Sequence, residues 1–559
     1  MEDNMIRSKI VSSLEKAFLD QKLEDFEALE YISALRGERL SIQLLHIYET
    51  AESPATWDPR RLPIVPEGEL APYVTIRRVF NVPVMKPTHF LGYDDNYLRT
   101  TPGVYPDLLK PLYYSGKISF ATDQLNSAWI EIDIPEDMKA GEYTLSFSFD
   151  GAEFGKCESS IKIEIIDAVL PKEDIYFTQW FHADCLANYY GVEVWSDRHF
   201  EIVENFVRTA RRNGINMLLT PVFTPPLDTA VGGERRTTQL VGVTKTGEKY
   251  DFDFTLLDKW IDMCDRCGMD YLEISHFFTQ WGAAHAPKIM ATVDGEYKKI
   301  FGWDTDALGE EYSTFLRAFL TALLAHLKAR GDDKRCFFHV SDEPGLKHLE
   351  NYKKAKALIA DLLDGYTIMD ALSNFGFYET GVLDHPIPSN NHIQPFIDAD
   401  VKDLWTYYCV SQPLQVSNRY ISMPSWRNRS IGMQMYKYNI KGFLHWGYNF
   451  YNNQYSGDPI NPFTETCADF VFPAGDAYSV YPENDGTALE SIRMAVFFEA
   501  LQDIKAMKLA ESLTSHDEVV KAIEDMFGKE ITFDTCAKSS DMMLNIRQRV
   551  NEIIKKNSK

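Results

Sequence analysis

From about residue 172 the chain alternates apolar, strand-like segments with amphipathic helical ones, and this alternation constrains the fold more than any other feature. Helical segments lie between most of the strand candidates, and several end in glycine, as helices often do. Eight strand–helix units predict an α/β fold built on a TIM-like (β/α)8 barrel. The strand candidates are residues 175–184, 215–223, 269–278, 335–344, 366–374, 403–410, 441–450 and 477–482.

The remaining segments predict further domains around this barrel, which we expect over residues 172–512. Residues 51–171 consist of short alternating segments separated by glycine and proline, and this pattern predicts a β-sandwich domain ahead of the barrel. Heptad-like spacing predicts an N-terminal helical segment over residues 1–50, and we expect a C-terminal helical tail over residues 513–559.

Composition restricts the classes of partner. Lys and Arg total 57 against 82 Asp and Glu, a formal net charge of −25, so neither nucleic acid nor an anionic membrane is expected to bind. No apolar run is long enough to cross a bilayer, and the first residues lack the apolar core of a signal peptide. We therefore expect no membrane insertion, and a cytoplasmic location unless an export signal has been removed.

The sequence contains no pattern typical of a metal or cofactor site. Eight cysteines are scattered along the chain, and Cys264-x-x-Cys267 has no second pair to complete a zinc site. G-x-S-x-G, P-loop, G-x-G-x-x-G and H-E-x-x-H motifs are also lacking. We expect neither metal nor cofactor, although His182-x-Asp184 leaves a metal-dependent, amidohydrolase-like barrel as an alternative.

An apolar segment that ends in Asp342-Glu343-Pro344 is the strongest candidate for chemistry. Neighbouring side chains on a regular strand point to opposite faces, so both carboxylates can serve one site only where the backbone twists or bulges. Two close carboxyl groups should then raise the pKa of one of them, which suits acid catalysis. The alternative is a solvated Asp-Glu turn in which Asp342 lies near a helix N-cap.

The active site of such a barrel lies at the carboxyl ends of its strands. Polar and aromatic residues at these ends predict a sugar-binding site, because aromatic rings stack on the C–H faces of sugars. Taken singly, each residue is equally compatible with a structural role. The predicted substrate-binding residues are His182, Asp184, His276, Asn374, Tyr407, Trp446 and Tyr448.

On three segments the chain resembles glycoside hydrolase family 123, the β-N-acetylgalactosaminidases. They are HVSDEP (339–344), HWGYNFYN (445–452) and the stretch from VYP to ESIRMAVFFEALQDIKAMK (480–507). The resemblance implies retaining hydrolysis of terminal β-linked N-acetylgalactosamine, in which the 2-acetamido oxygen of the sugar is the nucleophile. Asp342 would orient the acetamide and stabilise its charge, and Glu343 would protonate the leaving oxygen and then activate water.

Two other functions remain open on the residues alone. One is a conventional retaining glycosidase for a sugar without an acetamide, with Asp184 as its nucleophile. The other is a carbohydrate-binding protein on a barrel that has lost catalysis. In each case the expected partner is a carbohydrate.

Overall fold

The computed structural model describes residues 5–49, 60–113, 116–151, 155–172 and 175–558. The chain divides into two compact units, and each is described by itself. The sheet unit comprises residues 1–173, 413–438 and 489–559, and the barrel unit comprises residues 174–412 and 439–488.

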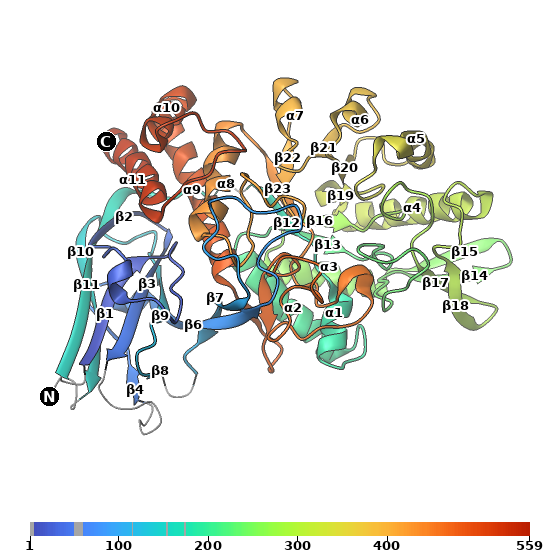
Figure 1. Ribbon diagram of the computed structural model, residues 1–559. Coiled ribbons are helices and arrows are strands. Elements are labelled where there is room, and N and C mark those ends of the chain that lie inside the picture. The colour runs from blue at the N-terminus through green and yellow to red at the C-terminus, as the bar shows by residue number, and fades with distance from the viewer. Residues whose placement is uncertain (1–4, 50–59, 114–115, 152–154, 173–174, 559) are drawn as a thin grey trace. The chain divides into compact units, whose positions relative to one another are not determined.

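The barrel unit is built on a parallel sheet of eight strands (Figure 1). Its edge strands meet through one parallel bridge, between Ser389 and Tyr407, so the sheet forms a nearly closed barrel. In spatial order the strands are β21 (His385–Ile387), β20 (Thr367–Ala371), β19 (Cys336–Phe338), β16 (Tyr271–Ile274), β13 (Met217–Thr220), β12 (Tyr176–Gln179), β23 (Gly442–His445) and β22 (Trp405–Tyr407).

Seven of the predicted strands are confirmed, and the eighth is wrong. Residues 477–482 contain β24 (Val480–Pro482), which pairs with β25 (Ala488–Glu490) outside the barrel sheet. The missing barrel strand is β21, which lies between the strands predicted at residues 366–374 and 403–410. It has three residues with Pro386 in the middle, and so short a strand has no recognisable periodicity.

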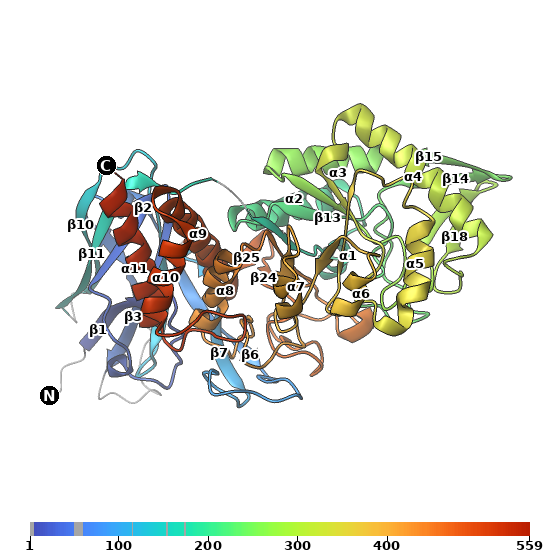
Figure 2. The same ribbon diagram turned by 90° about the horizontal axis from the view of Figure 1, so that it is seen from above.

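Helices and a small added sheet complete the barrel unit. The added sheet lies apart from the barrel strands in Figures 1 and 2 and was not predicted. Its order is β15 (Lys249–Asp253), β14 (Gly242–Thr246), β17 (Ile289–Val293) and β18 (Glu296–Phe301). The helices are α1 (Ala183–Tyr189), α2 (Asp197–Arg212), α3 (Thr255–Cys267), α4 (Glu310–Arg330), α5 (Leu349–Ala357), α6 (Phe375–Glu379) and α7 (Gln394–Asp398).

The sheet unit contains two larger sheets and a two-stranded one. One hydrophobic cluster holds buried side chains from both larger sheets, including Ile42 and Ile130 of the first and Phe147 and Ile163 of the second. The first sheet orders β1 (Met5–Ser12), β3 (Arg39–Glu49), β9 (Asn126–Asp133), β6 (Val74–Val84) and β7 (Gly103–Pro111). The second orders β2 (Tyr31–Arg36), β11 (Gly155–Val169), β10 (Gly141–Gly151) and β5 (Val65–Glu67), and β4 (Arg60–Pro63) pairs with β8 (Lys117–Phe120).

The predicted N-terminal helix over residues 1–50 is wrong, because β1, β2 and β3 occupy most of this segment. Pairing of β3 with β1 and β9 buries nearly all of its side chains, and such tertiary pairing overrides local helical spacing. The sheets therefore begin at Met5 rather than near residue 51. Sandwich packing of the two larger sheets stays a prediction.

Helices from late in the chain belong to the sheet unit. They are α8 (Ser425–Lys437), α9 (Ile492–Leu513), α10 (His516–Phe527) and α11 (Ser540–Asn557). Two of them, α10 and α11, confirm that the tail from residue 513 is helical. Among the described residues, α8 and α9 belong to the sheet unit, and the expected barrel boundary at 512 stays a prediction.

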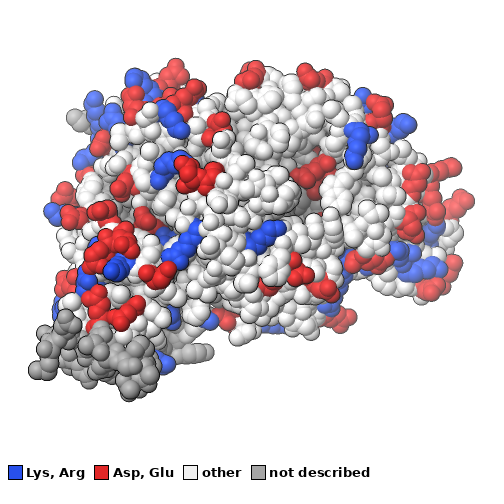
Figure 3. Space-filling view, viewed as in Figure 1, with Lys and Arg blue, Asp and Glu red and all other residues white. Residues whose placement is uncertain are grey.

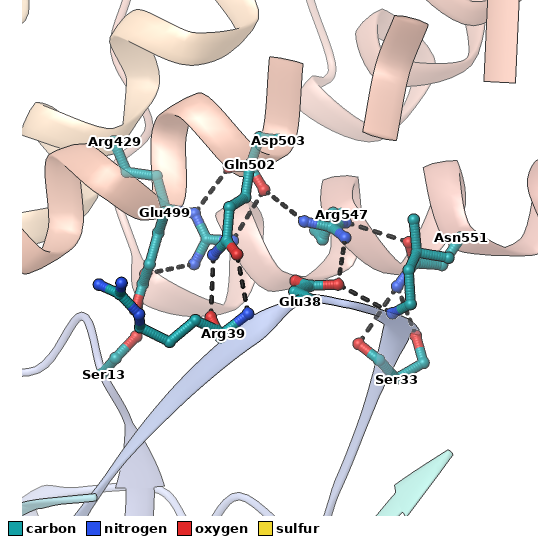
Figure 4. Close-up of polar contacts among 11 residues, drawn as sticks. Ser13, Ser33, Glu38, Arg39, Arg429, Glu499, Gln502, Asp503, Arg547 and Asn551 are labelled. Carbon is teal, nitrogen blue, oxygen red and sulfur yellow. Dashed lines mark hydrogen bonds and ion pairs between the residues drawn. The ribbon is translucent and has the colours of Figure 1, made fainter. Parts of the chain in front are cut away.

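Buried ion pairs join these helices to one another and to the sheets (Figure 4). The guanidinium of Arg429 donates to both carboxylate oxygens of Asp503, at 2.7 and 2.9 Å, and to Glu499 at 2.7 Å. Arg547 donates to Asp503 at 3.0 Å and to Glu38 at 2.7 Å. Such a network fixes the register of α8, α9 and α11, because a buried charge that loses its partner is costly.

Figure 3 shows acidic and basic side chains interspersed over the face in view. Among the described residues, we find no helix that combines the length and the apolar character needed to cross a membrane.

Candidate active site

A cavity of about 190 Å³ lies where the barrel strands end. Trp180 directly follows β12, Ala371 and Tyr407 are the last residues of β20 and β22, and Trp446 directly follows β23. The cavity is therefore at the carboxyl ends of the strands, where barrel enzymes place their catalytic groups. Its lining includes the acidic side chains Asp228, Asp342 and Glu343, and the aromatic side chains Trp180, Trp281, Tyr407, Trp446, Tyr455 and Phe472.

Asp342 and Glu343 both line this cavity. Glu343 has a φ of 44°, in the left-handed region, so the chain departs from the alternation of a regular strand at this residue. The carbonyl of Asp342 accepts the N–H of Trp281 at 2.8 Å, and the N–H of Glu343 donates to the carbonyl of Ala371 at 3.2 Å. Bonds to the loop after β16 and to the end of β20 thus hold the pair.

The environment favours the neutral form of Asp342. Burial raises the pKa of its carboxyl group well above the ordinary value, and the nearby charges of Glu343, Asp370 and Asp228 raise it further. The charge of His339 acts in the opposite direction. The sequence predicts that one carboxyl group of the pair holds a proton, and these influences favour Asp342 as that group.

Tyr407 holds the other carboxylate. Its hydroxyl donates to Oε1 of Glu343 at 2.6 Å, and burial together with this acidic neighbour raises the pKa of Tyr407 well above its usual range. A tyrosine that does not ionise remains a hydrogen-bond donor across the working pH range. Glu343 itself is exposed, so a molecule in the cavity can reach it.

Several lining residues adopt a left-handed backbone. The φ angles of Asp228, Trp281, Glu343 and Tyr455 are 39°, 61°, 44° and 60°. Each costs about 1 to 3 kcal/mol in a residue that is not glycine, and such strain accumulates at functional sites. At all four positions the strained residue has an acidic or aromatic side chain that lines the same cavity.

Trp446 supplies an indole face to the cavity, and the protein fixes the opposite edge of the ring. Its Nε1 donates to Oδ2 of Asp476 at 2.9 Å. Trp180 is anchored in the same way, because its Nε1 donates to Oε1 of Glu273 at 2.7 Å. Both rings are therefore held rigidly, as sugar-stacking platforms need to be.

The structure does not place His182 and Asp184 in the cavity lining. Both are buried, and Arg235 donates to the two carboxylate oxygens of Asp184 at 2.9 and 2.6 Å and to Nδ1 of His182 at 3.1 Å. Burial and the charge of Arg235 lower the pKa of His182 to about 3, and Arg235 holds the pKa of Asp184 below its ordinary value. Nε2 of His182 donates to the backbone carbonyl of Trp446 at 2.8 Å, so this cluster holds the backbone of a residue that lines the cavity.

Tyr448, His276 and Asn374 also lie outside the lining. Tyr448 is fully buried, and its hydroxyl donates to the carbonyl of Phe206 at 2.8 Å. His276 is buried beneath Trp180, with ring centroids 5.3 Å apart. Asn374 is the exposed N-cap residue of α6. Of the predicted substrate-binding residues, Tyr407 and Trp446 line the cavity.

Sequence reasoning missed the cavity residues that lie on loops. Asp228 follows β13, Gln280 and Trp281 follow β16, and Tyr455 lies in the long loop after β23. Burial raises the pKa of Asp228 to about 6, and its Oδ2 accepts the N–H of Tyr455 at 3.0 Å. Only their position after strands could have indicated them, since left-handed backbone has no signature in residues of these types.

His276, His339 and Asp370 offer ligand atoms within 4.8 Å of one another, but their chemistry does not suit a metal. The two ring nitrogens of His339 are bonded to Glu273 and Asp370, at 2.7 and 3.1 Å, and hydrogen bonds to these carboxylates raise its pKa to about 10 despite burial. An imidazolium has no free lone pair, and a metal ligand must be the neutral base. We therefore assign no metal to this cluster.

Comparisons with known proteins point to one enzyme family. Residues 180–510 match the family model described as "Glycoside hydrolase 123, catalytic domain". Among curated proteins, no match was found. A solved family 123 glycoside hydrolase from Clostridium perfringens, studied for glycolipid glycan hydrolysis, is similar at a TM-score of 0.73 with 15% identity. The match covers 99% of this chain and 97% of that one, so the two share a fold over their full length.

A GH5 xyloglucanase from Bacteroides ovatus is a more remote match. Its TM-score is 0.29 with 9% identity, over 87% of this chain and 99% of that one, and nothing is inferred from it.

Proposed function

Because the chain belongs to glycoside hydrolase family 123, it is a glycoside hydrolase, and we propose that it removes terminal β-linked N-acetylgalactosamine from glycans or glycolipids. We further propose that the acetamido oxygen of the sugar is the nucleophile. The observation that carries this proposal is the placement of Asp342 and Glu343, adjacent in sequence and in the lining of one cavity. The Clostridium perfringens protein, studied for glycolipid glycan hydrolysis, supports the choice of substrate class.

The geometry suits two steps. In the first, Glu343 gives its proton to the glycosidic oxygen while the acetamido oxygen attacks the anomeric carbon, and the aglycone leaves. Asp342, as a carboxylate, accepts the acetamide N–H and stabilises the oxazolinium. In the second, Glu343 takes a proton from water as the water oxygen attacks the same carbon, which reopens the ring and returns a β-configured sugar.

This mechanism needs a different proton distribution from the resting one. Burial and the neighbouring acidic groups raise the pKa of Asp342 and so favour a proton there, whereas the reaction needs the proton on Glu343. Substrate supplies an N–H donor to Asp342 and a weakly basic oxygen to Glu343. Both contacts favour transfer of the proton within the pair, because hydrogen bonds to the charged form of an acid lower its pKa.

Asp228 makes a conventional retaining mechanism the second candidate. The nucleophile first considered for it, Asp184, is buried in its ion pair with Arg235 and does not line the cavity, whereas Asp228 does. If Asp228 attacks the sugar, Asp228→Asn should abolish turnover and Asp342→Asn should be tolerated better. Substrate assistance predicts the reverse order, with Asp342→Asn costing roughly 10²- to 10³-fold.

A substrate series tests the proposal directly. Aryl β-N-acetylgalactosaminide should be hydrolysed, and replacing acetyl by mono-, di- and trifluoroacetyl should slow hydrolysis progressively, because fluorine withdraws electrons from the attacking oxygen. Aryl β-N-acetylglucosaminide tests the epimer preference, and aryl β-galactoside tests the need for an acetamide. A flat response to fluorination, or a sugar trapped covalently on Asp228, would overturn substrate assistance.

A further inference from the structure

A fully buried charged triad lies behind the catalytic strand end. Glu273, His339 and Asp370 are each 0% exposed and come from or directly follow the adjacent strands β16, β19 and β20. Nε2 of His339 donates to Oε1 of Glu273 at 2.7 Å, and its Nδ1 donates to Oδ1 of Asp370 at 3.1 Å. The imidazolium is thus clamped between two carboxylates in the barrel interior.

One arm of the triad holds the backbone that leads to Asp342. The carboxylate of Asp370 accepts the N–H of Val340 at 3.1 and 3.3 Å and the N–H of Ser341 at 3.3 Å. The hydroxyl of Tyr352 completes this arm by donating to Oδ2 of Asp370 at 2.5 Å. The two amides immediately before Asp342 are therefore bonded to one carboxylate, which limits the positions that Asp342 can take.

The other arm holds the cavity floor. Glu273 accepts the hydroxyl of Thr178 at 2.5 Å through Oε2 and Nε1 of Trp180 at 2.7 Å through Oε1. The Oε1 atom that holds the Trp180 indole is the one that binds His339. A single imidazolium is thereby linked, through one carboxylate on each side, to two residues of the cavity lining, Trp180 and Asp342.

We propose that the Glu273–His339–Asp370 triad positions Asp342 and Trp180 and that His339 supplies the positive charge that lets Asp342 ionise during the reaction. The inference rests on the proposed function, because only substrate assistance needs Asp342 as an anion. Burial and the charges of Glu343, Asp370 and Asp228 oppose that ionisation, and His339 favours it. His339 is a positioning residue, since it acts through other groups.

The surroundings of His339 keep it charged. Besides the two carboxylates, the ring that faces it is His276, stacked on it at 4.3 Å with an interplanar angle of 20°. Burial and the charge of His339 lower the pKa of His276 well below its usual value, so this neighbour is neutral. Neither ring nitrogen of His276 bonds to a described residue, so His276 does not compete for the carboxylates that hold His339.

The pH dependence of kcat/KM on an activated aryl β-N-acetylgalactosaminide tests this inference. When the leaving group is good, protonation by Glu343 does not limit the rate. The fall of kcat/KM at low pH, the acidic limb of the profile, then reports the group that must be ionised. His339→Gln removes a positive charge and should move that limb up by about one pH unit, whereas Asp370→Asn removes a negative charge and should move it down by a similar amount. Tyr352→Phe removes a hydrogen bond to Asp370 without changing any charge and should leave the limb in place.

A purely structural triad predicts a different result. All three variants would then lose activity equally at every pH with an unshifted limb, and that outcome, or shifts in the same direction, would overturn the inference. Thermal unfolding shows which variants fold. If His339→Gln does not fold, the contrast between Asp370→Asn and Tyr352→Phe decides. If the variants show no shift of the acidic limb while the wild type is still slowed by acetamide fluorination, the role of the triad is refuted but the proposed mechanism is not. If fluorination does not slow the wild type, the proposed mechanism itself is refuted.

Discussion

Glu343 combines exposure to the cavity with a short hydrogen bond from a buried tyrosine, and this combination predicts how its removal affects different substrates. Glu343→Gln should retain much of the kcat/KM on aryl glycosides with good leaving groups and lose roughly 10²-fold or more of the kcat/KM on those with poor ones. The reason is that a good leaving group departs without a proton, and general acid catalysis contributes about 10²- to 10⁴-fold where it is needed.

Kinetics on two aryl N-acetylgalactosaminides that differ only in leaving-group pKa would measure this effect. Tyr407→Phe is the matched control, since it removes the hydrogen bond but leaves the acid, and it should reduce both rates by similar factors. Equal losses of kcat/KM on both substrates for Glu343→Gln would show that Glu343 is not the acid.

At the level of single residues the sequence predicted the acidic pair and part of the aromatic lining. Asp342 and Glu343 were recognisable because an apolar strand ends in two carboxylates and a proline. His182 and Asp184 do not line the cavity, and strand-end position cannot reveal that Arg235, about 50 residues later, binds both. Asp228 and Trp281 were missed because their orientation depends on left-handed backbone in loops.

At the level of elements, β23 begins with a glycine that the barrel needs for packing. A Cβ at Gly442 would lie 2.1 Å from Cδ2 of Trp405. Moving the Trp405 ring away would disturb its packing, because it is buried and stacks on Tyr176 at 5.2 Å with an interplanar angle of 17°. Gly442→Ala should lower the free energy of unfolding by about 2 kcal/mol through overpacking, as measured by urea denaturation.

Gly103→Ala is a suitable control, because Gly103 also begins a strand and an added Cβ would be 3.8 Å from its nearest neighbour, an ordinary contact. The urea concentration at which Gly103→Ala is half unfolded should stay close to that of the wild type. If the two variants unfold at the same urea concentration, then the close packing between β22 and β23 contributes nothing to stability.

The strands that the sequence predicted are those with a long apolar run. β12, β13 and β16 lie inside such runs, whereas β21 has three residues and a proline. The added sheet of β14, β15, β17 and β18 was missed because its strands are only five or six residues long and none lies in a long apolar run. Short strands outside a long apolar run are thus recognised by their pairing and not by their own sequence.

At the scale of the whole molecule, the units are interleaved along the chain. The sheet unit takes α8 from between two barrel strands and α9 from after the last one. A domain boundary inferred from sequence is a single point, so it could not represent this arrangement. The buried pairs of Arg429 and Arg547 explain why α8, α9 and α11 associate, yet their partners are up to 509 residues apart.

This buried network also makes global stability depend on pH. Burial raises the pKa of Glu499 from 4.5 to about 7, with Arg429 only partly compensating. The folded protein therefore binds a proton there that the unfolded chain releases above about pH 4.5. The stability that Glu499 contributes is present below that pH and is lost as the pH rises through 7. Between pH 5 and 8 the free energy of unfolding of the wild type should fall by about 1 to 3 kcal/mol relative to that of Glu499→Gln.

Urea denaturation of both proteins at pH 5, 6, 7 and 8 measures this difference. Subtracting one free energy of unfolding from the other cancels the contribution of every group that the two proteins share. One such group is the buried amine of Lys16, whose pKa is lowered to about 7 mainly by burial. Glu518→Gln makes the same charge change at an exposed site in α10 and should run parallel to the wild type. Parallel curves for Glu499→Gln as well would mean that Arg429 keeps Glu499 ionised throughout. The ion pairs in Figure 4 would then stabilise the fold equally at pH 5 and pH 8.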